Sequence, residues 1–220
     1  MADETNAGEL RNGVERLGIP LADRQQRLLL AYLQLLVKWN RAYNLTAVRD
    51  PREMISRHLL DSLSVLPRLC GQRVADVGSG PGLPGIPLAI ADPDSQFVLL
   101  DSNGKKTRFA AHAARRLELA NVTVVKSRVE DYADEVGFDT VISRAFARVS
   151  DFVRLAGHLC GQSGCLMAMK GRLDPEELAE VPPDWRIAET RELRVPGVDA
   201  HRHQIVILPA TATPQNKRQK

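Results

Sequence analysis

The feature that most constrains this chain is a glycine-rich loop directly after a short apolar stretch. Segment 73–89 reads RVADVGSGPGLPGIPLA, with glycines at Gly78, Gly80, Gly82 and Gly85. Glycine accepts left-handed backbone and lets a ligand lie where a Cβ would collide. A helix after such a loop points free backbone N–H groups at the ligand. A strand, a glycine loop and a helix in this order therefore predict a nucleoside-cofactor site.

A second carboxylate makes this prediction more specific. The apolar stretch 97–100 ends in Asp101, about twenty residues beyond the glycines, where folds of this type place the acid that holds a ribose hydroxyl. The loop is also preceded by Asp76 and contains the prolines Pro81, Pro84 and Pro87. These features favour S-adenosylmethionine as the cofactor. The loop alone leaves an NAD site and a purely structural turn as alternatives.

Length and composition limit the number of domains and indicate the cellular compartment. The length of 220 residues fits one domain with an appendage, and 44% hydrophobic and 26% charged residues are ordinary for a globular protein. No apolar run is long enough to cross a bilayer and the start is polar, so we expect a cytoplasmic monomer with no membrane partner. Cys70, Cys160 and Cys165 share no metal-ligand spacing, which predicts no metal site and reduced, buried or half-buried thiols.

Helical periodicity dominates residues 1–70, which predicts an N-terminal helical extension. A frayed start and a short helix end at Gly18, a glycine C-cap, and Asp23 is the expected N-cap of a longer helix. Asp50 and Pro51 predict the start of a third helix.

The third helix brings Arg57, His58 and Asp61 close together. A histidine near an aspartate invites an acid–base role. Two neighbours on one helix more often make a structural hydrogen bond, which is the favoured interpretation, and catalysis stays open as the alternative.

From residue 71 onward, apolar strands alternate with helices, which predicts a mostly parallel sheet with helices on both faces. Five strands are expected at 74–77, 97–100, 122–125, 138–142 and 164–169. Segments 186–195 and 204–208 add an antiparallel pair at the edge, which makes a seven-stranded α/β core over 71–210. Residues 211–220 are polar and basic and are expected to be a disordered tail.

Basic residues gather after the ends of several strands. They are Lys105, Lys106, Arg115 and Arg116 after the second strand, Arg144 and Arg148 after the fourth, and Lys170 and Arg172 after the fifth. The carboxyl ends of parallel strands share one edge, where open α/β folds bind ligands and where cations can meet phosphates. The net charge of +3 permits an anionic partner without demanding one. A solvated face is the alternative, but recurrence after separate strands favours a polyanionic substrate.

Several short motifs occur together in one order. They are NLT at 44–46, RHLLDS at 57–62, DVGSGPGLPG at 76–85, LDS at 100–102, SRVE at 127–130, SRAFA at 143–147 and KG at 170–171. In this order and spacing, residues 25–208 resemble the bacterial small-subunit ribosomal RNA methyltransferase G family, also called glucose-inhibited division protein B. The resemblance implies a Rossmann-like class I S-adenosylmethionine-dependent methyltransferase fold. It also implies methylation of N7 of one guanine near the decoding site, with 16S ribosomal RNA or the small ribosomal subunit as partner.

The resemblance further implies roles for individual residues. Gly78, Gly80 and Leu83 would line the methionine part of the donor, Asp101 would hold the ribose, and Val129 and Glu130 would border the adenine. Ser79 and Ser102 belong to the same donor site. Arg144 would be the catalytic residue, placed where the donor and the target guanine meet. The tentative RNA contacts are Lys105, Lys106, Arg115, Arg116, Phe146, Arg148, Lys170 and Arg172.

The residues after the fourth strand favour a ring nitrogen as the methyl acceptor. Enzymes that methylate an exocyclic amine commonly use an Asn/Asp-Pro-Pro-aromatic loop there, and this chain has SRAF at 143–146. Methylation of a pyrimidine carbon needs a nucleophilic cysteine, and no cysteine falls in that loop. Guanine N7 attacks the methyl group directly, so alignment and exclusion of water suffice. Phe146 is a candidate stacking partner for a guanine that is flipped or single-stranded.

Two other classes of function remain open at this point. An NAD(P)-dependent oxidoreductase could use the same loop, although the chain has no evident hydride-transfer site. A non-catalytic RNA-binding or assembly factor could keep the fold without methyl transfer. A comparison of NADH binding with S-adenosylmethionine binding distinguishes the oxidoreductase from a methyltransferase. An assay of methyl transfer distinguishes the non-catalytic RNA-binding factor from a methyltransferase.

Overall fold

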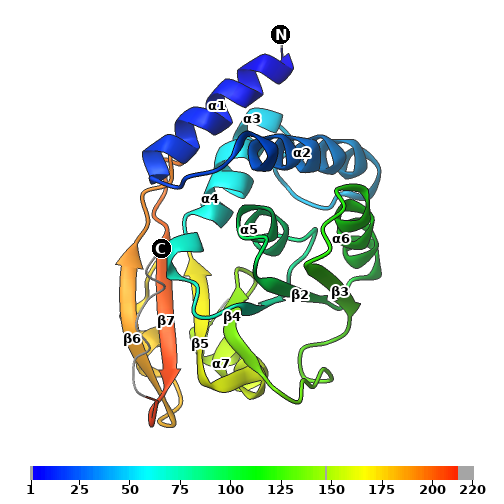
Figure 1. Ribbon diagram of the computed structural model, residues 1–220. Coiled ribbons are helices and arrows are strands. Elements are labelled where there is room, and N and C mark those ends of the chain that lie inside the picture. Colours follow the sequence, from blue (N-terminus) through cyan, green and yellow to red (C-terminus); the bar gives the residue numbers. More distant parts are fainter. Residues whose placement is uncertain (1, 147, 213–220) are drawn as a thin grey trace.

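A single twisted sheet with helices on both faces forms the centre of the molecule (Figure 1). The computed structural model describes residues 2–146 and 148–212. The strands are β1 (Arg73–Val77), β2 (Gln96–Asp101), β3 (Val122–Lys126), β4 (Phe138–Ser143), β5 (Cys160–Lys170), β6 (Trp185–Glu192) and β7 (His203–Pro209). Their order in the sheet is β3-β2-β1-β4-β5-β7-β6, with β1 to β5 parallel and β7 antiparallel to both its neighbours. The predicted seven-stranded, mostly parallel α/β sheet with an antiparallel edge pair is confirmed.

Helices cover both faces of this sheet. One face carries α5 (Gly85–Ala91) and α6 (Gly104–Arg116), and the other carries α7 (Val149–Ala156), with a short α8 (Pro175–Ala179) packed against α7. Each face has its own hydrophobic cluster: Ile86 and Phe109 belong to the first, and Phe152 belongs to the second. Asn103 caps α6, because its side-chain oxygen accepts the N–H groups of Lys105 and Lys106.

The N-terminal helices join the first of these clusters. They are α1 (Ala2–Leu17), α2 (Asp23–Tyr43) and a continuous helical segment made of α3 (Pro51–Met54), a π-helical turn (Ile55–Leu60) and α4 (Asp61–Leu63), followed by a short 3-10 turn (Leu66–Arg68). Buried Leu10, Tyr32 and Leu59 lie in the same cluster as Phe109 of α6. The N-terminal helices therefore share one hydrophobic core with the face of the sheet that carries α5 and α6. Among the described residues no helix combines the length and the apolar character needed to cross a membrane.

Two details of the helical prediction are wrong. The first helix begins at Ala2, so it is longer than the short helix expected, although Gly18 ends it at φ +66° as predicted. Asp23 is not the N-cap of α2, since Ala22 occupies that position. The side chain of Gln25 accepts the Ala22 N–H at 2.7 Å and donates to the Ala91 carbonyl at 2.9 Å, so a contact with α5 fixes this helix end.

Other local predictions are confirmed. Asp50 caps α3 by accepting the Arg52 N–H at 2.9 Å. Cys70 and Cys160 are half-buried and Cys165 is buried, as expected.

The predicted disordered tail is not confirmed. Thr211 and Ala212, its first residues, follow β7 in a turn, and the remainder, 213–220, lies outside the described residues.

Two side chains of β4 hold the connection between α4 and β1 to the sheet. Asp139 accepts the N–H groups of Gln72 at 2.7 Å and Arg73 at 2.9 Å. Thr140, fully buried in β4, accepts the Cys70 N–H at 2.8 Å and donates to the Cys70 carbonyl at 2.7 Å. The Thr140 side chain thus satisfies both the N–H and the carbonyl of Cys70, which lies just before β1.

We predict that Thr140→Val lowers the free energy of unfolding by about 2–3 kcal/mol, because both backbone groups of Cys70 lose their partner while the volume is kept. Thr140→Ser is the matched control: it keeps the hydroxyl and loses only a methyl group, which costs about 1 kcal/mol. Urea denaturation measures the three free energies. A valine variant as stable as the serine variant would contradict this role of the hydroxyl.

Candidate functional site

The strand order reverses between β1 and β4, since the chain runs outward from β1 to β3 and then returns to β4. At the carboxyl ends of these two strands, buried Ser143 donates its hydroxyl to the Val77 carbonyl at 2.7 Å. The same oxygen accepts the Ala145 N–H at 3.1 Å. Crevices at such reversals are the usual ligand sites of open α/β sheets. Two cavities open here, one on each side of the Arg144–Ala145 peptide.

The first, which we name the glycine-loop cavity, has a volume of about 270 Å³. Five of the residues predicted to hold the donor line it: Gly78, Asp101, Ser102, Val129 and Glu130. The rest of its wall includes apolar Val77, Leu100 and Leu155, together with Phe146. Carboxylates beside an apolar wall suit a nucleoside, which combines a flat base with ribose hydroxyls.

Gly78 and Gly80 are two of the loop positions whose backbone requires glycine. Gly78 has φ +70°, and a Cβ built there would lie 2.7 Å from the Cβ of Ala145. Gly80 has φ +58° and donates its N–H to Asp101 Oδ2 at 2.8 Å. The other oxygen of Asp101 accepts the Asn103 N–H at 2.7 Å. Both oxygens are therefore fixed by backbone, and each keeps a second lone pair for a ligand.

The remaining predicted loop residues lie behind the cavity wall. Ser79, Gly80 and Leu83 are buried and are not among the lining residues. Tyr32 of α2, also fully buried, donates its hydroxyl to the Pro81 carbonyl at 2.9 Å, so the helical region braces the loop. Ser79 Oγ has no hydrogen-bond partner among the described residues, an unsatisfied polar atom next to the predicted donor site.

Asp76 is the most perturbed carboxyl group of this region. It is fully buried at the end of β1, and Oδ2 accepts the Gly85 N–H at 2.7 Å, whereas Oδ1 has no partner within the described part of the chain. Burial raises the pKa of Asp76 to about 7, although the Gly85 N–H and the charge of Arg144 both act to lower it. A buried carboxyl that titrates near neutral pH beside a ligand cavity is typical of functional sites.

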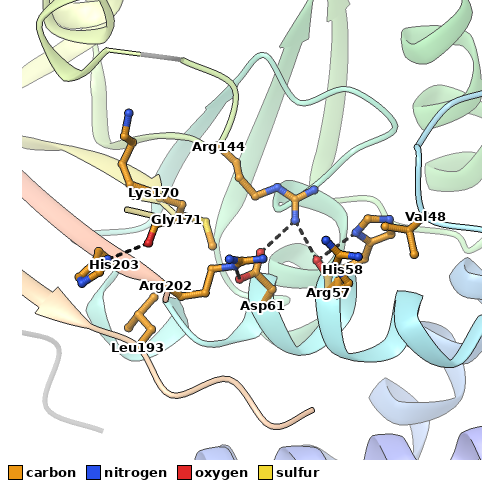
Figure 2. A pocket seen from close by; sticks show the side chains of 11 residues that line it. Val48, Arg57, His58, Asp61, Arg144, Lys170, Gly171, Leu193, Arg202 and His203 are labelled. Atoms are coloured by element: carbon orange, nitrogen blue, oxygen red, sulfur yellow. Dashed lines mark hydrogen bonds and ion pairs between the residues drawn. The ribbon is translucent and has the colours of Figure 1, made fainter. Parts of the chain in front are cut away.

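The second cavity, which we name the arginine cavity, has a volume of about 320 Å³ and lies between the helical segment, β5 and the start of β7. Its cationic and histidine lining consists of Arg57, His58, Arg144, Lys170, Arg202 and His203 (Figure 2). Asp61 is its one acidic lining residue among those described. Arg144 Nη1 donates to Asp61 Oδ2 at 3.1 Å and to the Arg57 carbonyl at 3.3 Å.

His58 has a structural role in this cavity. Its Nε2 lies 2.9 Å from the Thr46 hydroxyl and its Nδ1 lies 3.0 Å from the Arg57 carbonyl. Burial and the nearby charge of Arg144 lower the pKa of His58 to about 4, so the ring is neutral at pH 7. The predicted hydrogen bond between His58 and Asp61 is wrong, because His58 bonds to Thr46 and to the Arg57 backbone, whereas Asp61 accepts from two arginines. The structural role expected for this histidine agrees with these bonds.

The structure separates Arg144 from the other predicted donor residues. Arg144 lines the arginine cavity, and its neighbour Ala145 lines the glycine-loop cavity. Arg144 thus does not line the glycine-loop cavity with the other predicted donor residues, although it is next in the chain to a residue that does.

The predicted RNA contacts fall into three groups. Lys105, Lys106, Arg115 and Arg116 lie on α6 and form no ion pair within the described ranges, and Arg172 is exposed just after β5. Lys105 and Lys106 are in the first turn of α6, but Arg115 and Arg116 are in its last turn, so the expectation that all four lie at the carboxyl edge of the sheet is wrong for these two arginines. Arg148 pairs with Glu180, and Lys170 pairs with Glu177 at 3.0 Å. Phe146 is half-buried, with its ring centroid 5.3 Å from that of Phe152.

Sequence reasoning missed one residue of this site. Arg202 Nε donates to Asp61 Oδ1 at 3.1 Å, across 141 positions of the chain. Asp61 belongs to the RHLLDS motif, but Arg202 lies in the connection before β7, outside the motifs and outside any periodic pattern. Only the tertiary structure brings the two together.

Comparison with solved structures identifies the class of protein that has this fold. Magnesium protoporphyrin IX methyltransferase of Synechocystis PCC 6803, solved with bound S-adenosylmethionine, matches this structure with a TM-score of 0.60 at 14% identity, over 81% of this chain and 97% of that one. Its likeness concerns the fold alone. Together with the strand order and the glycine loop, it defines a Rossmann-like class I S-adenosylmethionine-dependent methyltransferase fold.

Comparison of sequences gives the family. The ribosomal RNA small subunit methyltransferase G of Stutzerimonas stutzeri is 52% identical over 209 residues, which cover 94% of this chain and 97% of that protein. The protein of the same name from Salmonella paratyphi B is 53% identical over 190 residues, 86% of this chain and 92% of that one. A family model described as rRNA small subunit methyltransferase G matches residues 25–206. The chain belongs to this family, as the motifs predicted.

We predict a specific pH dependence for Asp76. Its pKa is raised in the folded state from an ordinary value near 3.8 to about 7, so the fold favours the protonated carboxyl. The contribution of Asp76 to stability is therefore full below about pH 4 and is lost as the pH rises through 7. Asp76→Asn keeps an oxygen for the Gly85 N–H but does not titrate.

The measurement is the free energy of unfolding of both proteins between pH 4 and 8. The wild type should lose stability relative to Asp76→Asn as the pH rises across this window, and the difference should level off above pH 7. Titration of His58 has the opposite sign and cancels between the two proteins. A constant difference would show that Asp76 does not titrate as described.

Proposed function

We propose that this chain transfers a methyl group from S-adenosylmethionine to N7 of one guanine in 16S ribosomal RNA, near the decoding site. Family membership supports methylation of small-subunit ribosomal RNA. The observation that carries the proposal is the pair of cavities on either side of Arg144–Ala145, one suited to a nucleoside and the other basic. The proposal takes naked 16S RNA or the small subunit as partner and the enzyme as a cytoplasmic monomer.

The glycine-loop cavity fits the methyl donor by the chemistry of its wall. Asp101 would accept hydrogen bonds from the ribose hydroxyls, because its oxygens face the cavity from a position fixed by Gly80 and Asn103. Val129, which is nearly buried, and Glu130 would border the adenine, and Ser102 lies beside them. Gly78 lines the cavity and would border the methionine part of the donor, and the unsatisfied hydroxyl of Ser79 is next to it in the chain. Gly80 and Leu83 belong to the same loop and are buried.

The donor supplies an electrophilic methyl group on a sulfonium, and the in-plane lone pair of guanine N7 accepts it without a general base. This chain's residues then have to align the guanine and exclude water. A positive charge passes from the donor to the base, so a lone guanidinium nearby would oppose the transfer. Arg144 is paired with Asp61, whose carboxylate offsets its charge while leaving donors for the RNA.

Phe146 is proposed to contact the target base. Its ring lines the glycine-loop cavity and packs against Phe152 on one side. The other side of the ring could then stack on the planar guanine. Lys105 and Lys106 begin α6, and the stem of Lys106 passes 3.9 Å from the Cβ position of Gly80. These two cations therefore lie close to the glycine loop, where they suit a phosphate backbone that passes it.

The test is transfer of labelled methyl from S-adenosylmethionine to small ribosomal subunits that lack the modification, and to their naked RNA. We expect one new 7-methylguanosine, located by borohydride–aniline cleavage. Label at another atom would overturn the N7 assignment and leave the methyltransferase class intact. Donor binding without transfer to either substrate would overturn the proposal and favour a non-catalytic RNA-binding role.

We predict that Asp101→Ala weakens S-adenosylmethionine binding at least about tenfold, because the ribose hydroxyls lose a charged acceptor. Isothermal titration calorimetry measures the affinity. Asp131→Ala is the matched control, since Asp131 is exposed and does not line the glycine-loop cavity. Equal affinity of the Asp101 variant and this control would remove Asp101 from the donor site.

A further inference from the structure

One buried carboxylate holds two arginines that the chain brings from distant segments. The Asp61 side chain is only 3% exposed, and its two oxygens accept from Arg144 at 3.1 Å and from Arg202 at 3.1 Å. Figure 2 shows both guanidinium groups turned toward Asp61 from the loop after β4 and from the segment before β7. The π-helical turn Ile55–Leu60 immediately precedes Asp61 and presents the Arg57 carbonyl to Arg144 as well.

Several N–H groups of this cluster are left available. Arg144 uses only Nη1, and Arg202 uses Nε toward Asp61 and Nη1 toward the His201 carbonyl at 2.9 Å. Nε and Nη2 of Arg144 and Nη2 of Arg202 donate to no atom of the residues that the structure describes. The two side chains are 26% and 22% exposed, so these groups can reach a ligand in the cavity.

The side chains of the cluster also carry one more positive charge than negative charge. Arg57 pairs with Glu53 at 3.2 Å, and Lys170 pairs with Glu177 at 3.0 Å. In Figure 2 the ammonium group of Lys170 points away from Asp61. The single charge of Asp61 faces two guanidinium charges, so an anion would complete the balance.

The ligand of this cluster differs from the methyl donor. None of the loop residues Gly78–Gly85 lines the arginine cavity, and neither does Asp101. Two guanidinium groups on one cavity wall match a phosphate group, which accepts several N–H bonds at once.

The geometry points to a clamp for one phosphate of the RNA strand that carries the target base, formed by Arg144 and Arg202 with Asp61 as their positioning residue. The identity of the ligand as RNA rests on the proposed function. The clamp holds the strand beside the glycine-loop cavity, so it would fix the distance between the RNA backbone and the donor. Asp61 acts through the arginines and does not itself touch the phosphate.

The first experiment measures binding of naked, unmodified 16S ribosomal RNA across a range of salt concentrations. Arg202→Gln should reduce the slope of log affinity against log salt by about 1, as expected for one lost phosphate contact. Its affinity for S-adenosylmethionine should stay within about twofold of wild type, which also reports a folded protein. Arg11→Gln removes one exposed charge on α1 that lines neither cavity, and it should leave the slope unchanged.

The second variant separates positioning from charge. If Asp61 were merely a neighbouring negative charge, Asp61→Asn would tighten RNA binding, because repulsion of the phosphate is removed. If Asp61 positions the arginines, the same change should weaken RNA binding about tenfold even though the cavity becomes more positive. The opposite signs of the two outcomes make Asp61→Asn decisive, and Arg202→Gln tests the clamp independently if the Asp61 variant does not fold.

An unchanged slope in Arg202→Gln, or an equal reduction in Arg11→Gln, would overturn the clamp. Tighter or unchanged binding by Asp61→Asn would overturn the positioning role. Thermal stabilisation by inorganic phosphate that is lost in Arg202→Gln, without any change in the RNA slope, would assign the site to free phosphate and overturn the RNA clamp. Methyl transfer is measured separately. The clamp fails alone if N7 methylation occurs with an unchanged slope, and the proposed function fails alone if the slope falls without any transfer.

Discussion

The hydroxyl of Ser143 sets the geometry on which both cavities depend. It bridges the carboxyl ends of the two central strands, donating to the Val77 carbonyl at 2.7 Å and accepting the Ala145 N–H at 3.1 Å. Ala145 is thereby held against Gly78, where a Cβ on the glycine would come within 2.7 Å of the alanine Cβ. Arg144, the preceding residue, lines the arginine cavity, and Ala145 lines the glycine-loop cavity. One buried hydrogen-bonded serine and one missing Cβ thus position a residue of each cavity.

The two buried aspartates of the site show how differently a fold can treat a carboxyl group. Asp61 accepts hydrogen bonds from two guanidinium groups, whose attraction opposes the loss of hydration that burial brings. Asp76 has one backbone N–H and no cation in hydrogen-bond contact, and its pKa rises to about 7 because burial dominates. Neither arrangement is the most stable use of a buried position, since well-packed apolar residues often do as well. Asp61 lines the arginine cavity, and Asp76 is two residues from Gly78 of the glycine-loop cavity, so both lie where perturbed carboxyl groups are often functional.

Patterns local in the sequence predicted most of the fold and part of the site. Alternating apolar strands, the glycine loop and Asp101 specified the sheet and the glycine-loop cavity, because each depends on residues close together in the chain. The cap of α2 was mispredicted because Gln25, held by a contact with α5, outcompetes Asp23. Arg202 was missed because its pairing with Asp61 spans 141 residues and leaves no local pattern. The role of Arg144 came from family resemblance, and its separation from the glycine-loop cavity became visible only in three dimensions.

The distribution of free and paired cations narrows where an RNA strand can bind. Counting basic residues after strand ends treats Arg148 and Lys170 as equal to the cations of α6, but the first two are neutralised by Glu180 and Glu177. Lys105 and Lys106 keep their full charge in the first turn of α6, close to the glycine loop, and Arg144 and Arg202 share the single carboxylate of Asp61. Arg115 and Arg116 lie in the last turn of α6, toward the opposite edge of the sheet, so they add no charge beside the cavities. The cations of the described residues at the carboxyl edge thus favour an RNA path that passes the glycine-loop cavity, which direct transfer of a methyl group to a base would require.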